Sequence, residues 1–111
     1  MVDELKKWAV NYNISERAIA GFWKSYNTYM IDSPEEFDEV FGNTKQEDII
    51  LDIRYISLNL GNWPECNNNT ILACIPIVIE TGKDISYKEI GYYKLILNLD
   101  GTIQNDIFEI Y

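Results

Sequence analysis

The sequence contains no histidine, only two cysteines and no long apolar run. Without histidine, the commonest general acid and base of enzymes is missing. A zinc site is not expected either, because Cys66 and Cys74 are not spaced as a pair of metal ligands. There is also no nucleophile elbow, phosphate-binding glycine loop or dinucleotide fingerprint. We therefore predict a protein that is not an enzyme and that holds no metal or cofactor.

Basic residues are scarce, with 9 Lys and Arg against 18 Asp and Glu and a net charge of −9. Nucleic-acid binding needs positive charge to neutralise phosphates, so the composition argues against a nucleic-acid partner. The acidity suits a basic protein partner that is attracted by long-range electrostatics. Solubility alone is the other explanation of the same charge.

The chain also lacks an apolar segment long enough to span a membrane, and its N-terminus lacks the pattern of a signal peptide. We therefore expect a cytoplasmic protein that does not bind membranes and whose two cysteines are free thiols. A length of 111 residues predicts a single domain over residues 1–111, as a monomer or a homodimer.

The strongest structural signal is a β-hairpin over residues 87–111. Asp100-Gly101 lies between two apolar runs, and glycine tolerates the positive φ that hairpin turns require. A three-residue loop at 99–101 pairs Asn98 with Thr102 and leaves a G1 bulge at the glycine. We prefer it to a two-residue loop, which would bury polar side chains of the second strand.

This register predicts which side chains share a face of the hairpin. Lys94 lies opposite Asp106, and one face carries Tyr93, Leu95, Leu97, Ile103 and Ile107. Phe108 and Ile110 then fall on the other face, so we expect a twist or a bulge near Asp106.

Three helices are predicted before the strands. The first covers residues 3–12 with Asp3 as its cap, the second starts after a cap at Ser15, and the third starts at Ser33-Pro34. Gly42 is expected to end the third helix in the left-handed conformation. The second helix carries an aromatic stripe, which we interpret as a core face and alternatively as one wall of a ligand pocket: Ile19, Phe22, Trp23, Tyr26 and Met30.

The remaining segments read as strands and turns. Residues 49–60 predict a strand with a bend near Tyr55, with an amphipathic helix as the rival interpretation. Residues 71–80 are predicted to form a strand that either lies at a sheet edge near Pro76 or has a bulge there. Residues 81–84 are predicted to form a turn. Residues 61–69 predict a loop, in which we expect Trp63 to fold back over the core rather than to face a partner.

Together these elements predict an α+β fold, with three N-terminal helices packed on one face of a four-stranded antiparallel meander sheet.

The chain resembles the small acidic immunity proteins of bacterial polymorphic toxin systems. The resemblance rests on I-R-Y-I-S-L-N-L at 53–60, I-G-Y-Y at 90–93, L-D-G-T-I at 99–103 and D-I-F at 106–108. It implies a protein that binds and neutralises a cognate toxin, often a nuclease with a basic substrate-binding surface. The resemblance carries over no binding residue.

A second comparison is with the NTF2-like cone, which also packs N-terminal helices in a curved sheet. It implies a protein that binds or converts a small ligand, here in an aromatic pocket formed by Trp8, Trp23, Tyr26 and Tyr93. The chain departs from that family because it lacks a strand between its helices and has no His-Asp pair. A structural or oligomeric module is a third hypothesis.

For the immunity hypothesis, the candidate partner-binding residues are seven carboxylates that we expect on the surface and one tryptophan that could anchor an interface. They are Glu35, Glu36, Asp38, Glu39, Asp52, Trp63, Glu65 and Asp106.

Overall fold

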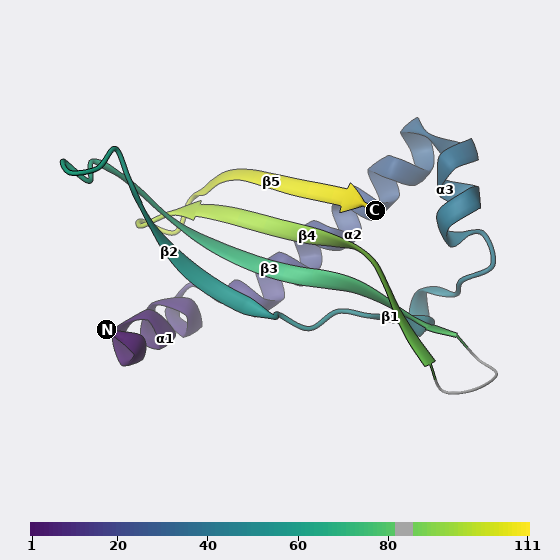
Figure 1. Ribbon diagram of the computed structural model, residues 1–111, viewed down its shortest axis with the longest axis horizontal. Coiled ribbons are helices and arrows are strands. Elements are labelled where there is room, and N and C mark those ends of the chain that lie inside the picture. Colours follow the sequence, from purple (N-terminus) through teal and green to yellow (C-terminus); the bar gives the residue numbers. More distant parts are fainter. Residues whose placement is uncertain (82–85) are drawn as a thin grey trace.

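Three helices precede an antiparallel sheet in the computed structural model of the chain; the second, α2 (Ile14–Asp32), lies across one face of the sheet, and the other two pack against α2 (Figure 1). The structure describes residues 1–81 and 86–111, so the turn predicted at 81–84 lies outside the described residues from Gly82 onward. The α+β prediction is confirmed, but the sheet has five strands and not four. In Figure 1, α2 runs behind the strands, and the face of the sheet turned to the viewer is left uncovered.

The helices are α1 (Val2–Asn11), α2 (Ile14–Asp32) and α3 (Pro34–Phe41). Asp3 lies in the first turn of α1 rather than at its cap, and α2 begins at Ile14 instead of after Ser15. The cap of α2 is Asn13, whose φ of 52° is left-handed and turns the chain sharply between the two helices. Ile14 is thereby buried in the core.

The third helix begins as predicted, with Ser33 at the cap and Pro34 in the first turn. Gly42 ends it with φ −56°, which is right-handed, so the prediction of a left-handed conformation at Gly42 was wrong. The predicted stripe of α2 is buried at Phe22 and Tyr26, whereas Met30 is exposed. Tyr29 contributes to the core in place of Met30.

The strand predicted over residues 49–60 is divided in two, and the helical alternative is wrong. After a short 3-10 helix (Gln46–Asp48), β1 (Ile49–Ile50) and β2 (Tyr55–Gly61) pair with the same edge of β3 (Asn68–Thr81). Residues 51–54 leave the ladder between them, apart from a 2.8 Å bond from the Arg54 N–H to the Cys74 carbonyl. The bend expected near Tyr55 is therefore a break, which accounts for the fifth strand.

Pro76 lies in β3 directly across from this break. Backbone groups of residues two apart in a strand point to the same side, and the Cys74 carbonyl points toward β2. The missing N–H of Pro76 therefore faces the gap between β2 and β1, where no ladder bond is lost. The expectation of a local edge is confirmed, and the pairing of β3 with β4 (Ser86–Asn98) also shifts at Ile77/Val78.

The hairpin of β4 and β5 (Ile103–Ile110) has the predicted three-residue loop. The Asn98 N–H donates to the Thr102 carbonyl at 2.8 Å, and Gly101 has φ 86°. Helix α1 holds this turn: the Trp8 indole N–H donates to the Leu99 carbonyl at 2.9 Å. No local pattern predicts this contact, because 91 residues separate the two partners.

The register beyond the turn differs from the prediction. Leu97 pairs with Ile103, but Ile96 pairs with Asn105, so one extra residue bulges at Gln104. Asp106 therefore lies opposite Leu95 and not opposite Lys94, which faces Ile107. Ile107 moves to the uncovered face, and Phe108 and Ile110 move to the core face. A bulge near Asp106 was expected and is present, but the predicted pairing of Lys94 with Asp106 was wrong.

Candidate partner-binding surface

The four carboxylates of α3 are held outward by the packing of its opposite side. The ring centroids of Phe37 and Phe41 lie 5.0 and 5.1 Å from that of Tyr26 on α2. This contact fixes one side of α3 against the core and leaves its acidic side in solvent. The exposed residues there are Glu35, Glu36, Asp38 and Glu39.

A groove of about 500 Å³ runs between α2 and β5, and a smaller hollow of about 320 Å³ continues it to the start of α3. Asp32 and Ser33 line both, so the two form one surface. We call this surface the acidic groove. Its lining residues are Lys24, Ser25, Thr28, Tyr29, Asp32, Ser33, Pro34, Glu35, Glu36, Asp106 and Phe108.

Asp106 reaches this groove because the bulge in β5 turns it toward α2. Its carboxylate accepts a 2.8 Å hydrogen bond from the Tyr93 hydroxyl and a 3.4 Å bond from the Ser25 hydroxyl. Burial, and then the hydrogen bond to Asp106, raise the pKa of Tyr93 well above its ordinary value. Tyr93 therefore stays a neutral donor that fixes the direction of the carboxylate.

The electrostatics of the groove favour a cation. Burial raises the pKa of Tyr29, and the negative charges of Glu36 and Glu39 raise it further. Lys24 is the one basic residue among the lining residues, against the four carboxylates of Asp32, Glu35, Glu36 and Asp106. A Lys or Arg side chain of a partner would meet carboxylates at the rim and aromatic rings inside.

Three predicted residues lie elsewhere. Trp63 and Glu65 are in the β2–β3 loop, at the end of the molecule away from α3 (Figure 1). Trp63 is 75% exposed, so the expectation that it folds over the core was wrong. Asp52 is exposed in the break between β1 and β2, on the opposite edge of the sheet from β5. The structure therefore joins Glu35, Glu36 and Asp106, with Asp38 and Glu39 beside them, but not these three.

Sequence reasoning missed Asp32, Tyr29 and Phe108 in the groove. Asp32 lies next to the Ser33 cap, and Tyr29 lies three residues after Tyr26, so both had a local signal. Phe108 had none, because only the bulge in β5 brings it to the helix side.

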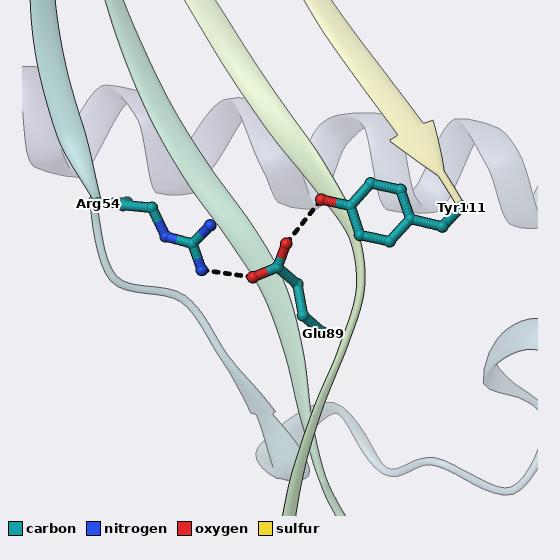
Figure 2. A network of polar contacts seen from close by, with 3 residues as sticks. All are labelled: Arg54, Glu89 and Tyr111. Carbon is teal, nitrogen blue, oxygen red and sulfur yellow. Dashed lines mark hydrogen bonds and ion pairs between the residues drawn. The ribbon is translucent and has the colours of Figure 1, made fainter.

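The uncovered face of the sheet carries a polar network that no pattern predicted (Figure 2). Arg54 forms an ion pair with Glu89, and the Tyr111 hydroxyl donates to the same carboxylate at 2.6 Å. The Lys94 ammonium lies 4.5 Å from the ring centroid of Tyr92, whose hydroxyl bonds to Glu109. The partner of Arg54 thus lies on β4, 35 residues away in the sequence.

Because of this network, the free energy of unfolding should change with pH in the acid range. The hydrogen bond from Tyr111, followed by that from Arg54, lowers the pKa of Glu89 below its ordinary value of 4.5. A lowered pKa stabilises the fold above pH 4.5, and the contribution is lost as the pH falls through the lower folded value. We expect the difference in unfolding free energy between wild type and Glu89→Gln to shrink as the pH falls below 4.5. Urea titrations across that range measure it, and a difference independent of pH would contradict the assignment.

The four aromatic residues of the predicted ligand pocket do not line one cavity. Tyr26 and Tyr93 are buried in the core, and Trp23 packs edge-on against Tyr26 with centroids 5.2 Å apart. Trp8 lies on α1, where it packs against Tyr12 and the hairpin turn. These contacts remove the basis on which a small-ligand pocket was predicted.

Among the residues that the structure describes, no helix is both long and apolar enough to cross a membrane. Comparison of the sequence with protein-family models found no match, and no curated protein and no solved structure matches the chain.

Proposed function

We propose that the chain is a binding protein that neutralises a basic protein toxin, as the immunity proteins that it resembles do. The observation that supports this proposal best is the acidic groove, where carboxylates from α2, α3 and β5 surround Tyr29 and Phe108. Such a surface suits a basic segment of the partner, since aromatic rings supply contact area and carboxylates supply charge-assisted hydrogen bonds.

The net charge of −9 supports the same partner chemistry from a distance. A strongly acidic protein attracts a cationic one before contact, and this raises the association rate at low salt. By occupying a basic substrate-binding surface, the chain would block a nuclease without catalysing any reaction itself. This mechanism needs no general base and agrees with the absence of histidine.

The proposal is tested by growth rescue. The chain is co-expressed with the product of the adjacent reading frame of its source genome, and survival of cells that the second protein otherwise kills is scored. Affinity capture from the same cells should recover that protein in a complex that salt dissociates. Absence of rescue, together with capture of no protein or only of acidic ones, would reject the proposal.

Neutralising the groove should weaken this binding. We expect the triple variant Asp32→Asn, Glu35→Gln, Glu36→Gln to bind the captured protein roughly tenfold or more weakly, mainly through slower association and with a shallower salt dependence. Surface plasmon resonance at several salt concentrations measures both.

The matched control is Asp3→Asn, Glu4→Gln, Glu16→Gln. It removes the same charge from the first turns of α1 and α2, outside the groove. Equal losses in the two variants would show that only net charge matters and would remove the groove from the proposal.

A further inference from the structure

The two edges of the sheet are protected to different degrees. An open edge strand invites pairing with another chain, and proteins block this with bulges, charges that point inward, or proline. The β5 edge has a bulge at Gln104 and an inward-pointing charge, Asp106, and it carries Glu109 on its other face. These features disfavour the addition of a strand to β5.

The β2 edge has none of these features. Its seven residues, Y-I-S-L-N-L-G, include no charge and no proline. Its register with β3 is unbroken from the Tyr55/Cys74 pair to the Gly61/Asn68 pair. In the described part of the chain β2 pairs with β3 alone, so its outer side offers free backbone donors and acceptors.

Apolar surface continues from this edge toward α1. Ile56, Leu58 and Leu60 alternate along the helix-side face of β2, and Leu58 and Leu60 are 39% and 48% exposed. A groove of about 480 Å³ separates α1 from Ile56, and Lys6 carries the one charged side chain among its described lining residues. The other lining residues are Met1, Val2, Leu5, Ala9 and Val10.

The charge of the molecule and the pattern of β2 select a second copy as the occupant. Two chains of net charge −9 repel each other, so they can approach closely only through a surface without carboxylates. Neither β2 nor the lining of the adjacent groove contains one. A basic toxin would find little electrostatic attraction at β2, whereas the carboxylates of the acidic groove on the opposite edge attract it.

The sequence of β2 is also complementary to itself. In an antiparallel pair centred on Leu58, that residue meets its own copy, Ile56 meets Leu60, and Ser57 meets Asn59. Apolar side chains then meet on the helix side and polar ones on the other side. A shift by one residue would place apolar side chains opposite polar ones. A shift by two, centred on Ser57 or Asn59, would leave Leu60 or Ile56 opposite a polar residue, so the pairing centred on Leu58 is favoured.

We infer that two copies of the chain pair through β2, antiparallel and centred on Leu58, to form a two-fold dimer with a continuous ten-stranded sheet. Each copy presents the same patch to the other, as a two-fold interface requires. The acidic groove lies beside β5, at the opposite edge, and stays free in each copy. The dimer therefore does not depend on the proposed function, and each proposal can fail alone.

Sedimentation equilibrium of the whole chain tests this inference. The expected mass is twice 13.0 kDa, with dissociation on dilution. Leu58→Lys places two like charges opposite each other at the two-fold axis, and we expect roughly tenfold or more weaker dimerisation. Ile107→Lys is the matched control, because Ile107 is 37% exposed on the other edge strand, and it should leave the dimer intact. A 13.0 kDa mass at every concentration, or a folded Leu58→Lys protein that dimerises as wild type does, would overturn the inference.

A disulfide test checks the register and does not depend on the folding of the lysine variant. Directly opposite residues in an antiparallel pair have Cα atoms close enough for a disulfide. In a Cys66→Ser background, oxidation should therefore link copies carrying Leu58→Cys. The same treatment of Leu60→Cys should yield little product, because Leu60 faces Ile56 rather than its own copy. Equal linkage at both positions, or none at Leu58→Cys, would overturn the proposed pairing.

Discussion

Replacing Phe22 by alanine should lower the free energy of unfolding by about 3–5 kcal/mol. Phe22 is 0% exposed and lies between α2 and the sheet. Its ring centroid is 5.0 Å from that of Trp23 and 5.8 Å from that of Phe108, which stacks on it at 26°. Truncation would leave a cavity that these rigid rings cannot close, because each is held by further aromatic neighbours.

Urea unfolding of the two proteins measures this loss as a fall in the midpoint at an unchanged denaturant slope. Met30→Ala is the control, because Met30 lies on the same helix and is 40% exposed. We expect it to cost less than about 1 kcal/mol. A similar small loss for Phe22→Ala would mean that the site collapses and that the aromatic cluster is not a fixed core.

The parts of the fold that local chemistry decides were predictable from the sequence. Ser33-Pro34 starts a helix because a first-turn proline loses no hydrogen bond, and Gly101 shapes its turn because it tolerates φ of 86°. Both features depend on residues that are adjacent in the sequence. The same holds for the break of pairing at Pro76, since the missing N–H belongs to that residue alone.

The features that the sequence did not predict depend on distant partners. An unbulged β5 would satisfy the turn equally well, but it would turn Phe108 away from Phe22. The stacking of these two rings supports the bulged register, and this is a contact between residues 86 positions apart (108 minus 22). The break at residues 51–54 likewise accompanies the ion pair of Arg54 with Glu89, 35 residues away.

The same distinction applies to the candidate site. Local patterns identified Glu35 and Glu36 on a predicted helix and Asp106 on a predicted strand as acidic candidates, and the structure places them in one groove. Trp63 was identified by its residue type, and the β2–β3 loop that carries it lies at the end of the molecule away from α3 (Figure 1). Charge can be read from a sequence, but the convergence of charges depends on strand register.

The second large effect is expected at Gly101, where alanine should lower the free energy of unfolding by about 2–4 kcal/mol. Two costs combine there. The φ of 86° is unfavourable for any residue with a Cβ. A Cβ at this position would also lie less than 3.0 Å from two carbons of the Tyr12 ring, a separation that real Cβ atoms do not adopt.

A double-mutant cycle with Tyr12→Ala separates these costs, because removal of the ring relieves the clash and leaves φ unchanged. In that background Gly101→Ala should cost only about 1 kcal/mol. The difference between the two costs measures how firmly α1 presses on the hairpin turn, which it also holds through the bond from Trp8 to Leu99. An equal cost in both backgrounds would mean that Tyr12 moves aside freely. In that case α1 would constrain the turn only through the bond from Trp8 to Leu99, and the bulged register of β5 would depend mainly on the stacking of Phe108 on Phe22.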